Sequence, residues 1–421
     1  MESMSIAVIG GGASGLCAAI SAAREARKAR LTVSVSLYER NPRVGKKLLM
    51  TGNGRCNLTN LHLRAACYNT PRALSLIRAV DAGGTRAFFE ELGILTREDE
   101  CGRVYPHSMQ AVSVVQALWQ EAERLGVSIH TQAAVTSIER AGSGFYLNRS
   151  YFCHGVVVAC GGASYPDTGS DGSGVRLLEQ LGVPCSRCIP VLTAVETAEK
   201  GFRALKGLRA KAEVRSVIDG KQSSAERGEL QFTEYGLSGI AVMQLSRGIS
   251  RAFADGKSHT VEIVSDLAEP FTERELRDFL LRLCQTYPHR PAQELLSGIV
   301  PKALGIFLLR RCGITAEKAQ CGAVTEDRVL ALARQIKSFR VPVKAVRGFR
   351  QAQATAGGAD LRGFDDGLMY RRIPGLFACG EVLDVDGICG GYNLEWAFSS
   401  GRISGKSAVR FLTEDSDDSG K

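Results

Sequence analysis

The sequence predicts an α/β protein: a Rossmann-like domain interrupted by an inserted β-barrel subdomain and a small helical subdomain. Three observations predict this fold class. An apolar run at residues 6–9 leads into a glycine-rich turn at residues 10–15. A second apolar run, far along the chain, ends in a glycine and a glutamate at residues 376–381. Between residues 190 and 350, short alternating segments and then helical periodicity replace this pattern, as expected of an insertion.

The first glycine turn has the spacing Gly10-x-Gly12-x-x-Gly15. Gly10 permits a tight turn, Gly12 lets the backbone approach a pyrophosphate, and Gly15 lets the next helix pack on the strand. Small and helix-favouring residues follow from Leu16 to Ile20, so a helix begins here. Its amino end would face phosphates with unpaired N–H groups and a partial positive charge.

The second strand of the domain ends in an acid. Apolar and polar residues alternate from Leu31 to Tyr38, and the run ends at Glu39, twenty-four residues after Gly15. A carboxylate at this place can accept hydrogen bonds from a ribose 2′-hydroxyl and would repel a 2′-phosphate. The two features together predict an adenine dinucleotide, without distinguishing FAD from NAD.

Length and composition indicate a cytoplasmic protein of several domains. A chain of 421 residues is too long for one hydrophobic core, and 44% hydrophobic with 23% charged residues is ordinary for a soluble protein. No apolar run is long enough to predict a membrane span. The 13 cysteines are odd in number and scattered, which favours reduced thiols. Cys185 and Cys188 form the only close pair, so no metal site is predicted, and they are either a redox pair or unrelated thiols.

The net charge of +9 is unevenly spread. Residues 414–421 contain four acids and one base, which leaves +12 on the rest of the chain. We expect residues 413–421 to form a disordered acidic tail. The basic body is compatible with a nucleic-acid partner, with anionic small substrates, or simply with solubility.

Residues 43–60 form a loop rich in glycine, asparagine and basic residues, with little that could enter a core. Lys47, Gly54, Arg55 and Asn57 could approach a pyrophosphate, a flavin carbonyl or an anionic substrate. The alternative is a solvated basic loop.

The next segments continue the Rossmann-like pattern. Helical spacing recurs between residues 73 and 125, and short strands follow, among them Ala134–Ile138. The continuous apolar run Val156–Cys160 predicts a strand buried on both faces, and it ends in Gly161 and Gly162. Ligands bind in open α/β sheets at such carboxyl ends of strands.

The predicted domains follow from these patterns. They are a discontinuous dinucleotide-binding domain (1–190 with 351–412), a β-barrel-like insertion (191–267 with 336–350) and a helical subdomain (268–335).

The last block distinguishes the two dinucleotides. The acid Glu381 could bind the polyol of a ribityl chain, and Gly390 to Asn393 open a long helix. The amide-rich end of this helix can stabilise negative charge on the pyrimidine side of a reduced flavin. A strand, acid, glycine and helix at the far end of the chain, paired with the first motif, are typical of FAD proteins.

These blocks closely resemble one family, the BaiN-like or YhiN-like FAD-dependent flavoproteins. The matching segments are GGGASGL (10–16), GKKLLMTGNGRCNLTN (45–60), VVACGGASYPDTGSDGSG (157–174), GELQFTEYGLSG (228–239), TAGGADL (355–361) and GLFACGEVLDVDGICGGYNLEWAFSSG (375–401). The resemblance implies a Rossmann-like FAD domain interrupted by a β-barrel and a helical subdomain. It also implies one of several reactions: reduction of a conjugated C=C bond in oxo-bile acids, reduction of uridine to dihydrouridine in large-subunit ribosomal RNA, or oxidation of aminoacetone.

The resemblance implies a set of FAD contacts when it is carried over by position. The predicted cofactor-binding residues are Gly10, Gly12, Ala13, Ser14, Gly15, Glu39, Arg40, Lys47, Gly54, Arg55, Cys56, Asn57, Val135, Gly161, Gly162, Gly380, Glu381, Asp384, Gly391, Asn393 and Leu394. Val135 is included because a strand at this place in the fold commonly touches adenine.

With a single dinucleotide fingerprint in the sequence, NAD(P)H is expected to dock only transiently and to reduce the flavin. Hydride would then pass to an electron-poor carbon, and a protein acid or water would protonate its neighbour. Cys56 and Tyr392 are the candidate catalytic proton donors, and each could instead be a packing residue. Arg55 beside Cys56 would favour the thiolate and so oppose a donor role.

Uridine in large-subunit ribosomal RNA is the favoured substrate, because basic residues cluster in the insertion. One cluster is Arg203, Lys206, Arg209, Lys211 and Arg215, and the other is Arg340, Lys344, Arg347 and Arg350. The alternatives are an unsaturated oxo-bile acid, steroid or other small enone, an amine such as aminoacetone, and a non-catalytic flavin redox sensor. The oligomeric state stays open.

Overall fold

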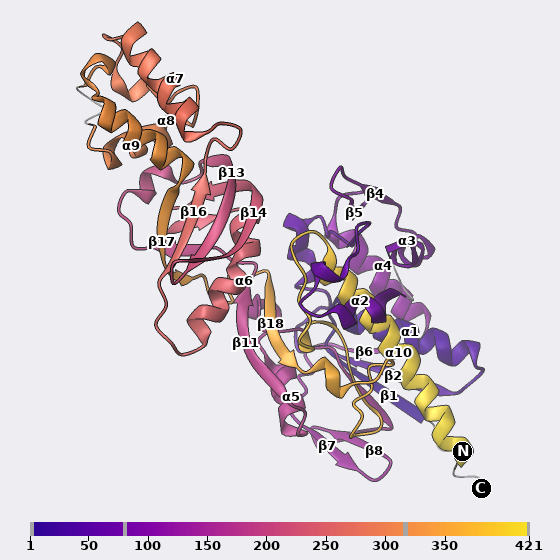
Figure 1. The fold of residues 1–421 in the computed structure, drawn as a ribbon. Coiled ribbons are helices and arrows are strands. Elements are labelled where there is room, and N and C mark those ends of the chain that lie inside the picture. Colours follow the sequence, from indigo (N-terminus) through magenta and orange to yellow (C-terminus); the bar gives the residue numbers. More distant parts are fainter. Residues whose placement is uncertain (1–3, 79–81, 315–318, 419–421) are drawn as a thin grey trace. The chain divides into compact units, whose positions relative to one another are not determined.

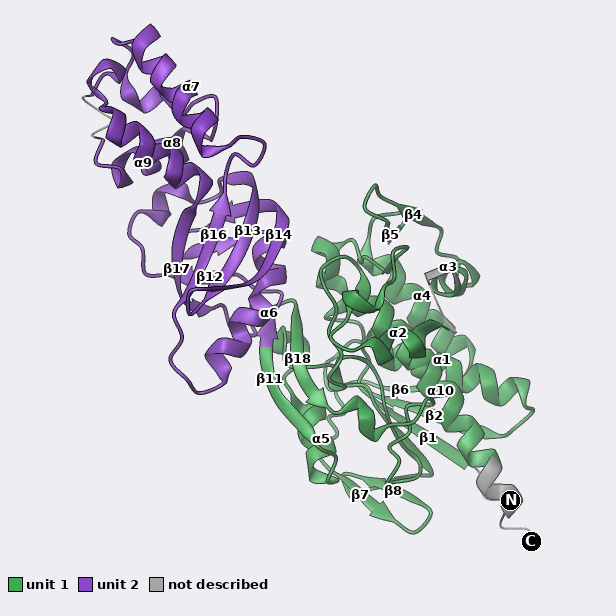
Figure 2. Ribbon diagram, viewed as in Figure 1, with its two compact units in different colours: residues 1–189, 353–421 green, residues 190–352 purple. Residues whose placement is uncertain are grey.

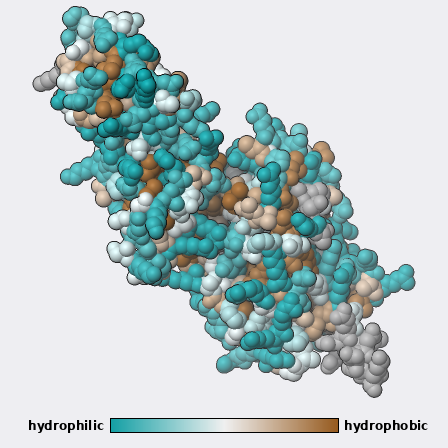
Figure 3. All heavy atoms as spheres, viewed as in Figure 1, coloured by the Kyte–Doolittle hydropathy of each residue, from teal (hydrophilic) through white to brown (hydrophobic). Residues whose placement is uncertain are grey.

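The computed structural model describes residues 4–78, 82–314 and 319–418. It divides into two compact units, Met1–Ile189 with Gln353–Lys421 (unit 1) and Pro190–Ala352 (unit 2) (Figures 1 and 2). The boundaries expected from the sequence lie at residues 190 and 351. Polar side chains cover most of the face seen in Figure 3, with small apolar patches between them.

Unit 1 is organised around a five-stranded sheet in the order β19-β10-β1-β2-β6. Its strands are β1 (Met4–Ile9), β2 (Val33–Tyr38), β6 (Ser128–His130), β10 (Gly155–Val158) and β19 (Leu376–Ala378). All four neighbouring pairs are parallel. The carboxyl ends of β1, β10 and β19 therefore lie at one edge. Gly10 follows β1 directly, Gly161 comes three residues after β10, and Gly380 comes two residues after β19.

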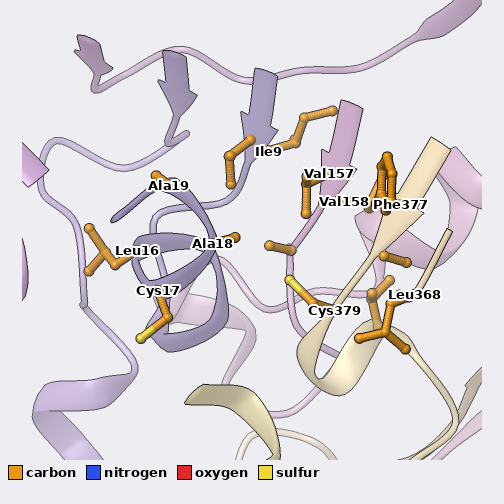
Figure 4. Packing of buried hydrophobic residues seen from close by; sticks show 14 of the residues in the cluster. Ile9, Leu16, Cys17, Ala18, Ala19, Val157, Val158, Leu368, Phe377 and Cys379 are labelled. Atoms are coloured by element: carbon orange, nitrogen blue, oxygen red, sulfur yellow. The ribbon is translucent and has the colours of Figure 1, made fainter. Parts of the chain in front are cut away.

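Helices α1 (Ala13–Lys28) and α10 (Tyr392–Asp418) pack closely in this unit. Gly401 and Gly405, one turn apart on α10, make this approach possible, because a Cβ at either position would overlap a carbonyl oxygen of α1, that of Ser14 or of Ala18. Side chains of α1, β1, β10 and β19 meet in the core beside them, as Figure 4 shows.

The remaining elements of unit 1 surround the sheet. The helices are α2 (Pro71–Ile77), α3 (Ala82–Glu91), α4 (Ala111–Arg124) and α5 (Ser173–Gln180). One three-stranded sheet contains β3 (Thr59–Asn60), β5 (Arg103–Pro106) and β4 (Thr96–Glu98), and another contains β7 (Ile138–Ala141), β8 (Gly144–Leu147) and β9 (Tyr151–Cys153). The predicted strand Ala134–Ile138 is wrong: residues 133–137 are irregular, and the strand begins only at Ile138.

Two strands join the sequence of unit 2 to that of unit 1. They are β11 (Cys185–Val191) and β18 (Ala354–Ala359), which pair in a two-stranded sheet. Glycines allow their close contact, since a Cβ on Gly357 would overlap the carbonyl group of Arg187.

Unit 2 contains a closed six-stranded barrel in the order β12-β15-β14-β13-β16-β17. Its strands are β12 (Val195–Thr197), β13 (Arg209–Ile218), β14 (Lys221–Phe232), β15 (Gly236–Ser238), β16 (Val261–Asp266) and β17 (Phe339–Val346). Phe232 lies 6.0 Å from both Phe202 and Phe339 in the core of this unit, measured between ring centroids. The barrel-like insertion is therefore confirmed.

Helices complete unit 2. They are α6 (Ile240–Ala254), which packs on β13 and β14, and α7 (Glu273–Thr286), α8 (Lys302–Arg311) and α9 (Glu326–Lys337). Thr272 caps α7 in a reciprocal pair with Glu275. Thr325 precedes α9 without a side-chain capping bond.

The carboxyl-terminal segment differs from the prediction. Helix α10 continues to Asp418, so residues 413–418 are helical rather than a disordered tail, and residues 419–421 lie outside the described residues. None of the helices in the described parts of the chain has the length and apolar character needed to cross a bilayer.

Candidate functional site

The amino end of α1 is open to a ligand. Gly12 precedes the helix without a side-chain cap, the first turn contains no acid, and a Cβ on Gly12 would meet nothing within 4 Å. Gly10 has φ +108°, and a Cβ on Gly15 would overlap the Gly10 carbonyl oxygen. The three glycines therefore meet the steric demands of a dinucleotide turn, and the free N–H groups of Ala13 and its neighbours point out of the helix end.

Glu39 is buried at the end of β2, beside this turn. Its Oε2 accepts a hydrogen bond from the Gly11 amide at 2.8 Å, and its Oε1 accepts two from the Asn41 backbone and side-chain nitrogens, both at 2.7 Å. These donors fix the carboxylate and leave part of its acceptor capacity for a hydroxyl group. Val135 lies close in sequence to Ala133, whose amide donates to the Glu39 carbonyl oxygen, although Val135 belongs to no strand.

Arg40 contacts the loop that contains Asp171 and Ser173. Its Nη1 lies 2.7 Å from Asp171 Oδ2 in an ion pair, and 3.4 Å from the Ser173 hydroxyl. Asn41 reaches the same loop by donating to the Thr168 carbonyl oxygen at 2.9 Å. The loop after Gly162 is thereby held against the residues that follow β2.

A second cluster joins four distant segments around Glu381. Lys47 Nζ lies 2.6 Å from Glu381 Oε2, which also accepts from the Gly162 amide at 3.2 Å. Glu381 Oε1 accepts from the Thr355 amide at 2.7 Å. Gly380 precedes this acid, and a Cβ there would overlap the side chain of Ser14. The predicted residues from both ends of the chain therefore come together.

Thr355 was missed by sequence reasoning. Its side chain is buried, and its Oγ1 accepts from the Ala163 amide at 2.8 Å and from the Ser164 amide at 3.1 Å. It thus supports the turn that contains Gly161 and Gly162. The only sequence signal for Thr355 is its place in the Thr-Ala-Gly-Gly block, just before the glycines.

The turn at residues 51–57 has a strained backbone and mixed exposure. Gly54 and Cys56 both have positive φ, +80° and +58°. Arg55 is exposed, with its guanidinium 5.5 Å from the ring centroid of Tyr105. Cys56 is fully buried, and burial raises the pKa of its thiol to about 12. The expectation that Arg55 favours a Cys56 thiolate is therefore wrong, because desolvation dominates and keeps the thiol protonated.

The amino end of α10 carries an unsatisfied acceptor. Asn57 is buried, and its Oδ1 has no hydrogen-bond partner among the described residues. Gly391 has φ +104°, and a Cβ there would come within 2.9 Å of Asn57 Oδ1 and 2.5 Å of the Thr59 carbonyl oxygen. A buried acceptor left without a donor is costly, so its placement here fits a ligand N–H or O–H group.

Asn393 and Leu394, at the start of α10, contact other protein groups. The Asn393 side chain both accepts from the Gly387 amide at 2.8 Å and donates to the Gly387 carbonyl at 2.9 Å, which fixes the loop before the helix. Leu394 is half-buried against the core.

Tyr392 is buried and engaged by protein groups. Its hydroxyl donates to the His62 carbonyl at 3.3 Å, and its ring stands at 90° to that of Tyr68. Burial raises the pKa of Tyr392 above its ordinary value. Both candidate proton donors, Cys56 and Tyr392, are therefore buried.

Asp384 ties strands together. Its Oδ1 accepts from the Gly357 amide at 3.0 Å and from Asn69 Nδ2 at 3.2 Å, and its Oδ2 accepts from the Ser186 hydroxyl at 2.9 Å. Its oxygens thus accept hydrogen bonds from β11, from β18 and from Asn69, two residues before α2. This network positions the loop that carries Glu381.

Cys185 and Cys188 are free and half-buried on β11. Burial raises the pKa of the first to about 12 and that of the second to about 11. Within the described segments, no group of His, Cys, Asp and Glu side chains is arranged to hold a metal ion.

Taken together, these groups fit FAD. The open end of α1 suits the pyrophosphate, Glu39 suits a ribose, Glu381 with Lys47 suits a polyol, and Asn57 at the end of α10 suits a polar ring edge.

Residues 4–407 match the family described as HI0933-like protein Rossmann domain. The 3-dehydro-bile acid delta(4,6)-reductase of Clostridium scindens is 35% identical, covering 96% of this chain and 98% of that protein. The ribosomal RNA dihydrouridine synthase of Escherichia coli is 29% identical, covering 95% and 96%. A solved flavocytochrome c3 fumarate reductase aligns with a TM-score of 0.46 and 16% identity over 97% of this chain and 79% of that one.

Proposed function

This chain belongs to the HI0933-like family and is an FAD-dependent oxidoreductase, and from that premise we propose that it reduces a carbon–carbon double bond conjugated with a carbonyl group. The relatives named above share this chemistry. A 3-oxo-4,6-diene is an extended enone, and dihydrouridine is uridine saturated at the C5=C6 bond next to its C4 carbonyl. Both acceptors are electron-poor at the carbon that takes up hydride.

The FAD that the site would hold supplies this hydride from its reduced ring, after reduction by NAD(P)H that docks transiently. The chain's own groups bind and orient it. The amino end of α1 neutralises the pyrophosphate, and Glu39 fixes the adenosine ribose. Lys47 forms an ion pair with Glu381 at 2.6 Å, which holds this side chain where the polyol would lie. The amino end of α10, with Asn57, faces the polar edge of the ring.

Uridine in large-subunit ribosomal RNA is the substrate that the charge distribution supports. Unit 2 contains 26 Lys and Arg against 18 Asp and Glu, a net charge of +8, whereas unit 1 contains 27 against 26, a net charge of +1. A polyanion would therefore be attracted to unit 2 rather than to the chain as a whole. The location that follows from this proposal is the cytoplasm.

The basic clusters are partly ion-paired. Lys206 lies 2.9 Å from Glu234, and Arg340 lies 2.8 Å from Glu262. These partners are substantially exposed, and exposed pairs contribute little, about 0–1 kcal/mol. Such bases can exchange a carboxylate for a phosphate, and the net charge of unit 2 stays positive when all of its acids are counted.

A steroid enone is the second candidate, and one observation favours it: the relative with the highest identity reported above is the bile-acid reductase. Its substrate would need an apolar pocket instead of a basic surface.

The two candidates are separated by deleting the gene in its host and mapping dihydrouridine in the large-subunit RNA. Loss of a dihydrouridine, restored by the wild-type gene, is the expected result. Intact dihydrouridine in a strain with no other synthase for that site would contradict the RNA proposal and leave the small enone.

A further inference from the structure

Glu395 is a buried acid in the first turn of α10. Its residue has no exposed surface, and its backbone amide donates to the Gly391 carbonyl at 2.9 Å. It is the acidic residue of this turn, next to the helix end proposed to face the flavin. Nothing in the flavin contacts described above uses its carboxyl group.

The surroundings of this carboxyl are polar but uncharged at close range. Its Oε1 accepts from the Thr85 hydroxyl at 3.0 Å and from the Ser399 hydroxyl at 2.5 Å. Its Oε2 has no hydrogen-bond partner in the described part of the chain. No ion pair joins Glu395 to a described Lys or Arg.

The nearest influential cation is engaged elsewhere. Arg402, further along α10, donates to the Gly84 carbonyl at 3.1 Å, and its guanidinium lies 4.8 Å from the ring centroid of Phe88. Cys17 of α1 and Tyr68 also face the carboxyl, and burial raises the pKa of both, so neither supplies a charge.

An ionised carboxylate in this place would be costly. A fully buried charge without a paired cation loses its hydration, and such groups bind a proton instead. Burial raises the pKa of Glu395, whereas the hydroxyls of Ser399 and Thr85 and the charge of Arg402 oppose the shift.

The protonation state decides what the helix end can do. Aligned peptide dipoles place about +0.5 elementary charge at a helix amino end, and a carboxylate in the first turn would cancel it. A neutral acid leaves this potential in place. Asn57 Oδ1, buried and unpartnered beside Gly391, shows independently that this end is built to meet a ligand.

We infer that Glu395 is a neutral carboxylic acid in the working protein, so that the positive end of α10 remains free to stabilise negative charge on a bound flavin. Glu395 is a positioning residue in this sense, since it acts through the helix end. The identity of the ligand rests on the proposed function, whereas the protonation of Glu395 does not.

The protonation state is tested first by infrared spectroscopy of the protein without added cofactor. Wild-type protein at pH 7 should show the carbonyl band of a buried, protonated carboxylic acid, and Glu395→Gln should lose it. Glu25→Gln is the matched control, because Glu25 forms an ion pair with Arg410 at 3.0 Å, and the band should remain in this variant. A difference spectrum without that band for Glu395→Gln would overturn the inference. If the variant fails to fold, the wild-type protein alone still tests the inference by titration of the band to alkaline pH. A wild-type spectrum without the band at pH 7 would overturn the inference.

The electrostatic role is tested by the midpoint potential of bound FAD against pH. The wild-type potential should fall below that of Glu395→Gln as the pH rises and Glu395 ionises. The electrostatic role of Glu395 would be overturned by a Glu395→Gln potential that is already higher than the wild-type potential at pH 7. It would also be overturned if the potential depended on pH in the same way in both proteins. A protein that binds no FAD would defeat the proposed function alone, because the infrared result would still stand.

Discussion

Glu39 is held in place by three protein donors, one from Gly11 and two from Asn41. A carboxylate fixed in this way loses little entropy when it accepts a further hydrogen bond from a ribose. We therefore expect Glu39→Ala to weaken FAD binding by about 1.5–3 kcal/mol, the range for a hydrogen bond to a charged group. The measurement is the dissociation constant of FAD from the refolded apoprotein.

The control for this change is Glu139→Ala, since Glu139 forms an exposed pair with Arg149 and should leave the affinity unchanged. An unaltered FAD affinity in a folded Glu39→Ala protein would remove Glu39 from the site.

The change Asn57→Ala should have different effects on the protein without FAD and on the protein with FAD bound. The Oδ1 atom of Asn57 has no hydrogen-bond partner among the described residues, so Asn57→Ala should cost the protein without FAD little more than the lost packing. The same change should weaken FAD binding by about 0.5–1.5 kcal/mol, because a neutral hydrogen bond is lost. Thermal unfolding with and without FAD measures both effects, and an equal loss of stability in the two states would mean that Asn57 is only structural.

Most residues of this candidate site could be predicted from the sequence, because glycines and acids at strand ends have recognisable chemistry. Thr355 could not be predicted, because its role depends on a contact with residues 163–164 made only in the fold. Glu395 was missed for a related reason. An acid in a helical first turn is ordinary in a sequence, and only burial makes it exceptional.

At the scale of elements, His259 joins three parts of unit 2. Its Nδ1 lies 2.6 Å from Asp219, in the turn between β13 and β14, and its Nε2 lies 2.9 Å from Asp255, at the end of α6. Asp219 also accepts from the Thr260 amide, just before β16. Hydrogen bonds to Asp219 and then Asp255 raise the pKa of His259 above its usual range.

This pKa shift predicts a pH dependence of stability. A histidine whose folded pKa is raised stabilises the protein fully below its unfolded pKa of about 6.5, and the stabilisation is lost as the pH rises through the folded pKa. Unfolding free energy should therefore fall over that interval in the wild type, and His259→Gln should flatten the fall. Parallel pH profiles for the two proteins would contradict the charged network.

Elements with clear periodicity were predictable, and those governed by long-range contacts were not. β17 (Phe339–Val346) is one of the alternating segments expected between residues 190 and 350, because apolar side chains recur at every second position of this strand. The first half of β14, Lys221 to Glu226, has no such alternation, since only Ala225 is apolar, and it forms a strand by pairing with β13. The segment around Val135 is irregular although its composition suits a strand, because it follows the backbone of Glu39 instead.

At the scale of the whole molecule, unit 2 carries almost all of the net charge. If RNA binds there, replacing the exposed Arg203, Lys211 and Arg350 by alanine should weaken RNA binding at low salt. Each lost phosphate contact should also reduce the slope of log K against log salt by about 0.7–0.9. The matched control is a triple replacement of the exposed Lys28, Arg30 and Arg97 in unit 1. Equal losses in the two triples would mean that binding follows overall charge and not unit 2.

The central claim is that this protein uses FAD to reduce an electron-poor double bond, and one anaerobic experiment tests it directly. Purified protein loaded with FAD is reduced with NAD(P)H, freed of excess donor, and mixed with large-subunit RNA that lacks dihydrouridine or with a 3-oxo-4,6-diene bile acid. We expect the absorbance of oxidised flavin to return without oxygen and one acceptor to gain two hydrogens in matching amount, with RNA as the expected acceptor. Flavin that stays reduced with both acceptors and reoxidises only in air, with formation of peroxide, would contradict it.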